Sequence, residues 1–155
     1  YLNVPIEFMK DCVRRILEEQ GIPVWFGADC HPMMDRENGA WATDLFEYGR
    51  VYDVDFDLDK EARVRYADSA MNHAMAFVGV DVADDGHTTR RWRVENSWGD
   101  KIADKGYFTM SDDWFTEYVY EVAVPKALLP DEYLKALEEP AQMLPAWDPM
   151  GALAQ

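Results

Sequence analysis

The sequence predicts an α+β fold, in which an antiparallel sheet curves into half of a β-barrel and carries flanking helices and an extended C-terminal arm. Three observations support this prediction. Strand-like runs separated by turn signals follow one another between residues 73 and 125. The region before them contains amphipathic helical patterns. The last segment, residues 140–155, has three prolines and no periodicity, which favours an extended chain docked on another surface.

The first helix is expected over residues 4–20, where apolar residues recur on one face at helical spacing. Asn3 is its expected N-cap, and Pro5 lies in the first turn, where a missing N–H does no harm. Gly21 suits the position after the last turn, because that position favours a left-handed backbone. A buried strand is then expected over residues 23–29.

The middle of the chain is less regular. Residues 31–52 contain Pro, Gly and Asn without a repeating pattern, so they are expected to form a long loop beside a functional cleft. Residues 59–67 are expected to form a short helix capped by Asp57 or Asp59.

The remaining patterns supply most of the sheet. Four strands are expected over 73–82, 88–97, 106–110 and 117–125, with a turn at 83–86 between the first two. Four antiparallel strands, or five with the one at 23–29, are therefore expected to form the sheet. Short helices are expected at 112–115, capped by Ser111, and at 130–138.

The charge of the chain excludes some functions. It has 15 Lys and Arg against 30 Asp and Glu, a net charge of −15. Such a field repels phosphate backbones and anionic lipid, so neither nucleic acid nor membrane is expected as a partner. No apolar stretch approaches the roughly 18–20 residues that cross a bilayer, and the N-terminus has no signal-peptide pattern.

Cysteine usage favours a reducing compartment, because Cys12 and Cys30 are too few for a disulfide framework. The protein is therefore expected to be soluble and cytoplasmic. The two Cys and three His show no zinc-ligand spacing, so no metal and no cofactor is expected. His31 and His87 are expected to face solvent.

A candidate catalytic pair stands at the ends of two expected strands. His73 begins one strand and Asn96 ends the next, so a hairpin would bring their side chains together. The Asn96 oxygen would accept the Nδ1–H of His73, which leaves Nε2 facing a nucleophile. Trp98, two residues later, would shield this hydrogen bond from water. A lone histidine at a strand start is more often structural, but the matching Asn96 and Trp98 favour catalysis.

The strings around these residues resemble a known family. NHAM and ENSWG are similar to the His and Asn motifs of papain-like cysteine peptidases. WRVENSWG, KGYFTMSDDWFTEYVYEV and LPAWDPMGALA resemble the C-terminal half of the bleomycin hydrolase/aminopeptidase C family. NVPIEFMK and VWFGAD extend the resemblance over nearly the whole chain, and only the stretch around Cys30–Ala42 looks divergent.

The resemblance implies a cysteine aminopeptidase that removes N-terminal residues from peptides. His73 would act as general base and then general acid, Asn96 would orient it, and Trp98 would support the site. The nucleophilic Cys would lie upstream of Tyr1, because Cys12 and Cys30 lack the motif that precedes such a residue. The fragment alone is therefore expected to be inactive.

The resemblance also implies a domain organisation and partners. Residues 1–139 would be the barrel half of a papain-like domain, whose partner is the N-terminal half of the same enzyme. Residues 140–155 would be an arm directed to the active-site cleft, with Leu153, Ala154 and Gln155 near the substrate amine. The family assembles into hexamers, so a homo-oligomer is expected.

Two alternatives remain open from the residues alone. The chain could be a non-enzymatic papain-like binding or assembly module without a nucleophile. It could also be an acidic binding domain unrelated to peptidases, which the length of the resemblance disfavours.

Overall fold

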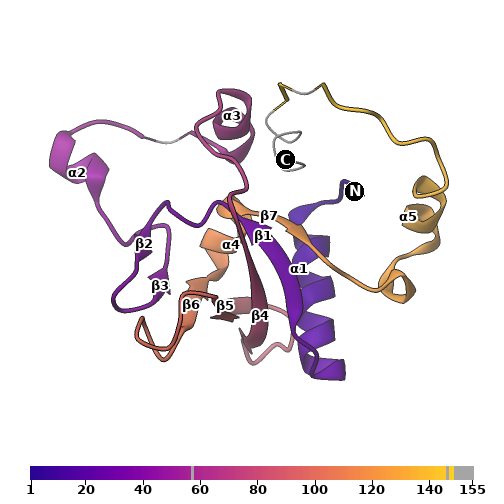
Figure 1. Cartoon of the computed structure of the whole chain (residues 1–155), viewed down its shortest axis with the longest axis horizontal. Coiled ribbons are helices and arrows are strands. Elements are labelled where there is room, and N and C mark those ends of the chain that lie inside the picture. Colours follow the sequence, from indigo (N-terminus) through magenta and orange to yellow (C-terminus); the bar gives the residue numbers. More distant parts are fainter. Residues whose placement is uncertain (57, 146, 149–155) are drawn as a thin grey trace.

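A curved sheet of seven strands forms the frame of the protein, with strand order β2-β3-β6-β5-β4-β1-β7 (Figure 1). The computed structural model describes residues 1–56, 58–145 and 147–148. Every neighbouring pair of strands is antiparallel except β3 and β6, which run parallel. The strands are β1 (Val24–Ala28), β2 (Met34–Asp35), β3 (Ala40–Trp41), β4 (His73–Val82), β5 (Thr89–Glu95), β6 (Tyr107–Ser111) and β7 (Val119–Val122).

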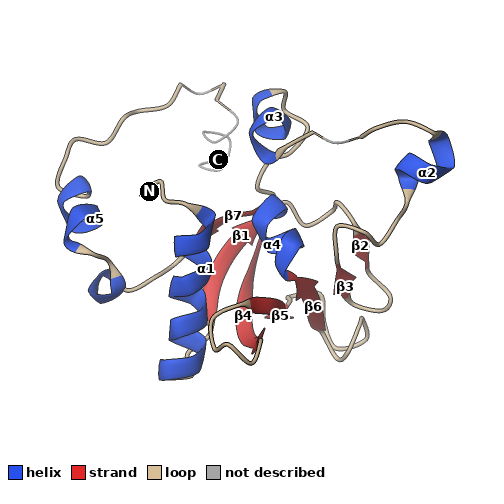
Figure 2. Ribbon diagram, turned by 180° about the vertical axis from the view of Figure 1, so that it is seen from behind, coloured by secondary structure: helices blue, strands red, loops and turns tan. Residues whose placement is uncertain are grey.

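Helices cover the sheet and extend from it on both sides. Figure 2 shows α1 and α4 in front of the sheet, and Figure 1 shows α2 and α5 standing away from it on opposite sides. The described helices are α1 (Ile6–Arg15) with a π-helical continuation η1 (Ile16–Gln20), α2 (Tyr48–Tyr52), α3 (Lys60–Arg65), α4 (Asp112–Tyr118), the 3₁₀ turn η2 (Lys126–Leu128) and α5 (Asp131–Ala136).

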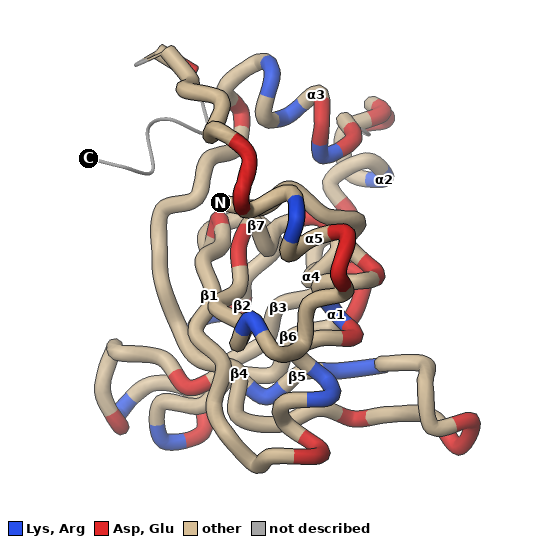
Figure 3. The backbone as a smooth tube through the Cα atoms, turned by 90° about the vertical axis from the view of Figure 1, so that its right-hand side faces the viewer, with Lys and Arg blue, Asp and Glu red and all other residues tan. Residues whose placement is uncertain are grey.

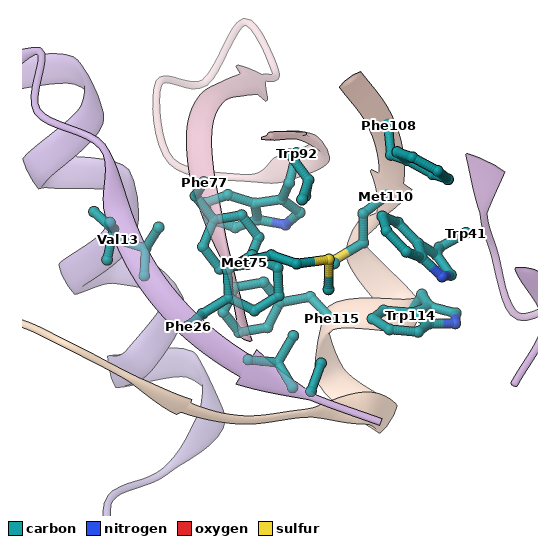
Figure 4. Packing of buried hydrophobic residues seen from close by; sticks show 14 of the residues in the cluster. Val13, Phe26, Trp41, Met75, Phe77, Trp92, Phe108, Met110, Trp114 and Phe115 are labelled. Carbon is teal, nitrogen blue, oxygen red and sulfur yellow. The ribbon is translucent and has the colours of Figure 1, made fainter. Parts of the chain in front are cut away.

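The core lies between the sheet and the two helices α1 and α4 (Figure 4). Alternate residues of β4, Met75 and Phe77, point into it, as the period of a strand requires. Val13 of α1 and Phe115 of α4 belong to the same buried cluster, and the Phe115 and Phe77 rings stack at a centroid distance of 5.2 Å. Aromatic packing therefore joins α4, and aliphatic packing joins α1, to the sheet on which the candidate pair lies.

The first helix differs from the predicted one at both ends. It begins at Ile6 after Pro5, not after an Asn3 cap, and no side chain bonds to its N-terminal N–H groups. Its last turn is π-helical, and Gly21 ends it in the left-handed conformation, as predicted. The amphipathic pattern fixes which face is buried, but it does not distinguish an α-helical turn from a π-helical one.

The predicted long loop at 31–52 contains regular structure, so that prediction was wrong in part. The β2–β3 hairpin and α2 lie within it. A β-carbon at Gly39 would lie 2.3 Å from the Ala103 Cβ, so glycine lets the hairpin approach the loop before β6. Two-residue strands carry too little alternation to be recognised in a sequence.

Elsewhere the elements agree with the prediction within a few residues. The strand at 73–82 is confirmed as β4, and Ser111 caps α4 by accepting the Trp114 N–H at 3.2 Å. That helix is longer than predicted and continues to Tyr118, which leaves only Val119–Val122 for β7. Asp59 caps α3, since its carboxylate accepts the Ala62 N–H at 2.7 Å, and the alternative cap, Asp57, lies outside the described residues.

The C-terminal segment is predicted to be an extended chain docked on another surface, and its described residues, 140–145 and 147–148, form neither helix nor strand. Leu153, Ala154 and Gln155 lie outside the described residues, so the direction of the arm stays a prediction.

Candidate active site

Two neighbouring strands bring His73 and Asn96 to the same edge of the sheet. His73 is the first residue of β4, where it pairs with Ala28 of β1. Asn96 directly follows Glu95, the last residue of β5. Because β4 and β5 are antiparallel, the start of one lies beside the end of the other.

The two side chains are joined by a hydrogen bond between His73 Nε2 and Asn96 Oδ1, 2.8 Å long. The same oxygen accepts the Ser97 backbone N–H at 2.8 Å, which sets the orientation of the carboxamide. An amide oxygen only accepts, so His73 Nε2 carries the proton of this bond. Asn96 is 8 % exposed, and low exposure strengthens the bond.

This geometry corrects the expected assignment of the ring nitrogens. We expected Nδ1 to bond Asn96, but Nε2 does, and Nδ1 is therefore the nitrogen left to exchange a proton with a nucleophile. Which ring nitrogen meets Asn96 depends on the side-chain torsions of His73, and nothing in the strand pattern determines those torsions.

Trp98 packs on the imidazole of His73. Its ring stacks on the His73 imidazole with a centroid distance of 5.2 Å and an interplanar angle of 20°. Phe108 of β6 supports the indole edge-on at 5.6 Å, and the Arg36 guanidinium lies 5.0 Å from the ring centroid. The indole is therefore held from several sides, which limits the movement of the imidazole.

Asn72, which the sequence analysis overlooked, anchors the backbone just before His73. Its N–H donates to the Ala28 carbonyl at 3.0 Å, and its side-chain oxygen accepts the Cys30 N–H at 3.0 Å. Its amide nitrogen donates to Asp29 Oδ1 at 2.6 Å and to His31 Nδ1 at 3.2 Å. The start of β4 is therefore tied to the end of β1 by several bonds.

A buried polar cluster continues this connection. Asp29 is buried and also accepts the Ser69 hydroxyl at 2.8 Å, while Ser69 and the Tyr120 hydroxyl lie 2.7 Å apart. Burial raises the pKa of Tyr120. In the sequence, this network could have been indicated by the polar residues after β1 together with the Asn before His73. These residues meet only because β1 and β4 pair, and that pairing cannot be seen in the local sequence.

Neither cysteine has the environment of a nucleophile. Cys12 and Cys30 are buried, as packing residues are. Burial raises the pKa of Cys30 to about 11, with a further contribution from Asp29, and burial also raises the pKa of Cys12. An activated thiol needs the opposite shift.

Other expectations concern metals, histidines and membranes. Among the described residues no group of three His, Cys, Asp or Glu could hold a metal ion. His31 and His87 are exposed, as expected. No described helix is long and apolar enough to span a bilayer. Two shallow hollows of the described surface lie over β4–β5 and between α1 and the β4–β5 turn, and neither is lined by His73 or Asn96.

Comparison with known proteins defines the class. A crystal structure of PepW from Lactobacillus rhamnosis superposes with a TM-score of 0.89 and 38 % identity, covering 96 % of this chain and 33 % of that one. The fold is therefore papain-like. The chain belongs to the Peptidase C1-like family, whose model matches residues 1–151.

Curated relatives indicate which members of this family the chain resembles. Aminopeptidase C of Lactobacillus delbrueckii subsp. lactis is 44 % identical over 99 % of this chain, and human bleomycin hydrolase is 43 % identical over 100 % of it. The chain spans about a third of the length of these relatives, 34 % in each case. The chain thus matches aminopeptidase C and bleomycin hydrolase relatives along 99 % and 100 % of its own length.

Proposed function

We propose that this chain carries the histidine–asparagine half of a cysteine aminopeptidase that removes N-terminal residues from peptides. The observation that carries the proposal is the 2.8 Å bond between His73 and Asn96 under the Trp98 ring. The names of the relatives, aminopeptidase C and bleomycin hydrolase, supply the class of reaction. The nucleophilic Cys would come from the N-terminal half of the same enzyme, upstream of Tyr1.

The geometry suits one sequence of proton transfers. His73 Nδ1 takes the proton of the nucleophilic thiol, and the thiolate attacks the carbonyl carbon of the scissile amide. As the C–N bond breaks, the imidazolium returns this proton to the leaving amine. In the second half, His73 takes a proton from water, the resulting hydroxide attacks the thioester, and the thiol leaves with the proton. No metal or cofactor is required.

Asn96 and Trp98 would orient and shield the His73 ring and would not act on the substrate directly. The Asn96 oxygen holds Nε2–H through both halves of the reaction, so the ring keeps Nδ1 directed at the nucleophile. The stacked indole keeps water from that bond. Asn72 would hold the backbone of His73 in place through its bonds to β1.

The C-terminal arm and the assembly follow from the family resemblance. Residues 140–155 would extend into the cleft, where Leu153, Ala154 and Gln155 would bring a terminal carboxylate to the substrate's free amine. Residues 1–139 would form the barrel half of the papain-like domain. The whole protein would act in the cytoplasm as a hexamer, without nucleic acid or membrane as partner.

The second candidate is a papain-like binding or assembly module without catalysis. One observation favours it: both cysteines of this chain are buried, with raised pKa values. The two candidates differ in whether the upstream segment supplies a reactive thiol.

The test uses the full-length reading frame and a fluorogenic aminoacyl amide such as alanyl-aminomethylcoumarin. We expect turnover that iodoacetamide abolishes, and His73→Ala should lower kcat by about a hundredfold or more, because general acid–base catalysis contributes roughly 10²–10⁴. His87→Ala, which removes an exposed histidine of the β4–β5 turn, is the control. The isolated 155-residue chain should show no turnover. An inactive full-length protein without an alkylated cysteine would support the binding module.

A further inference from the structure

Arg36 lies beside the candidate pair but takes no part in the proton transfers above. It stands in the turn between β2 and β3, and its guanidinium carbon lies 5.0 Å from the centroid of the Trp98 ring. The same ring stacks on His73 at 5.2 Å. One indole therefore contacts both the general base and an exposed cation.

The turn that carries Arg36 is held in one conformation. Asp35 Oδ1 accepts the backbone N–H groups of Glu37 at 3.1 Å and of Asn38 at 3.0 Å, and Asp35 Oδ2 accepts the Asn38 side-chain amide at 2.7 Å. Thr109 of β6 donates to the Gly39 carbonyl at 2.8 Å, which ties the turn to the sheet. The backbone at Arg36 therefore needs little ordering when a ligand binds.

The charge environment of Arg36 differs from that of the other arginines. Within the part of the chain that the structure describes, each of the others forms an ion pair with a carboxylate, whereas the recorded contact of Arg36 is with the Trp98 ring. A cation–π contact occupies no carboxylate, so the N–H donors of this guanidinium remain able to bind a planar anion. The paired arginines are Arg14, Arg15, Arg50, Arg63, Arg65, Arg90, Arg91 and Arg93.

We propose that Arg36 forms a subsite for a substrate carboxylate on the leaving-group side of the scissile bond. This inference rests on the proposed aminopeptidase function. His73 must reach the leaving amine in order to protonate it, so the peptide beyond that amine starts at the imidazole. The separations of 5.2 Å and 5.0 Å put the guanidinium carbon within roughly 10 Å of the imidazole centre, a span that about three extended residues cover.

The surrounding charge makes such a subsite useful. The chain carries a net charge of −15, and this field opposes the approach of an anionic peptide. The carboxylates next to Arg36 belong to Asp35 and Glu37. Hydrogen bonds from Asn38 lower the pKa of Asp35, and they also commit its oxygens to the turn. The guanidinium is thus the cation that a substrate carboxylate meets beside the Trp98 ring.

The experiment measures kcat/KM of the full-length enzyme for matched peptides. The first pair is Ala-Ala-Ala and its C-terminal amide, and the second is Ala-Ala-Asp-Ala-amide and Ala-Ala-Asn-Ala-amide. The pairs separate a main-chain carboxylate from a side-chain one. We expect Arg36→Gln to reduce the preference for the anionic member of at least one pair by about two- to fivefold, as exposed ion pairs of roughly 0.2–1 kcal/mol allow. Arg36→Lys should retain part of the preference, and added salt should weaken it in the wild type.

Two controls separate the possible failures. Arg65→Gln removes the same charge from an exposed site on α3 and should leave both preferences unchanged. Alanyl-aminomethylcoumarin, which has no residue beyond the scissile bond, tests the proposed function alone. If the wild type does not hydrolyse it, both the function and this subsite are overturned. If it does, but Arg36→Gln lowers kcat/KM equally for charged and neutral peptides, Arg36 only supports Trp98 and the subsite is overturned.

Discussion

At the scale of single residues, the site depends on which nitrogen of His73 faces outward. Asn96 Oδ1 receives two donors, His73 Nε2 and the Ser97 N–H, and both would have to move before the carboxamide could turn over. A side chain without an oxygen at this position would leave the imidazole free to rotate. In the proposed mechanism Asn96 therefore sets the orientation of the ring, and His73 would carry out the proton transfer.

This division of roles predicts the outcome of changing Asn96. Asn96→Ala in the full-length enzyme should lower kcat by a smaller factor than His73→Ala and leave KM nearly unchanged, because the base remains but is poorly oriented. Steady-state kinetics on one aminoacyl amide would measure both. A loss with Asn96→Ala as large as that with His73→Ala would mean that Asn96 does more than orient the ring.

Cys30 makes the stability of the protein depend on pH. Its folded-state pKa is raised to about 11, above the ordinary thiol value, so the unfolded chain ionises first as pH rises. Its contribution to stability should be complete below about pH 8.5 and lost by about pH 11. The melting temperature of the wild type should therefore fall more steeply over this range than that of Cys30→Ala.

The comparison with Cys30→Ala is necessary because Lys60 acts in the opposite direction. Burial lowers the pKa of Lys60 to about 8, so between about pH 8 and pH 10.5 this group adds stability as pH rises. Both proteins carry Lys60, and its contribution cancels in the difference. Parallel melting curves for the two proteins would contradict the role assigned to Cys30.

At the scale of elements, the β2–β3 hairpin shows how close packing constrains the chain. Gly39 and Gly86 both have left-handed backbones, with φ of 71° and 73°. A β-carbon at Gly39 would meet the Ala103 Cβ at 2.3 Å, whereas one at Gly86 would meet nothing within 4 Å. The two glycines thus share a backbone conformation and differ in the space around them.

Substitution of each glycine by alanine separates these two effects. Gly86→Ala should cost roughly 1–2 kcal/mol from the left-handed conformation alone. Gly39→Ala should cost about 1–3 kcal/mol more from overpacking. Thermal unfolding of the full-length protein would measure the difference. Equal losses of stability from the two substitutions would show that the loop around Ala103 moves to accommodate the added methyl group without strain.

Elements with long local patterns could be predicted, and those that depend on distant partners could not. β4 and α3 carry their own periodicity and caps, so their positions were predicted within a residue or two. β2 and β3 exist because β3 pairs with β6 across the chain, and the Asn72 network exists because β4 pairs with β1. The His73–Asn96 pairing could be predicted because the two residues lie at adjacent ends of the strands of one hairpin, whereas Arg36 lies outside that hairpin.

At the scale of the whole molecule, charge and exposed apolar surface indicate contacts beyond this chain. Figure 3 shows acidic and basic positions interspersed along the backbone, and many of the basic ones pair locally with carboxylates. The segment from β3 to α3 exposes several large apolar side chains and stands away from the sheet (Figure 1). They are Phe46, Tyr48, Val51, Tyr52, Val54, Phe56 and Leu58. Surface of this kind is typical of a contact with another part of a larger protein.

The C-terminal arm carries the prediction that concerns substrate choice. Removal of residues 144–155 from the full-length enzyme should reduce its preference for substrates with a free amine, because the carboxylate proposed to pair with that amine is lost. Rates for alanyl-alanyl-aminomethylcoumarin and its N-acetylated form, before and after truncation, would measure this. An unchanged preference would place amine recognition elsewhere in the enzyme.

The candidate site lies at one end of the β4–β5 hairpin, and the turn lies at the other end. Between them the register of the two strands shifts twice, at Phe77/Gly79 and at Asp81/Val82. Such bulges absorb an extra residue without reversing the faces of the strands beyond them. The turn, closed by a 2.8 Å bond from Ala83 N–H to the Thr88 carbonyl, lies beyond the end of the ten-residue strand β4 that is opposite His73. An epitope or reporter peptide inserted between Asp84 and His87 should leave the turnover of the full-length protein unchanged. This turn would then be a suitable attachment point for immobilising the active protein.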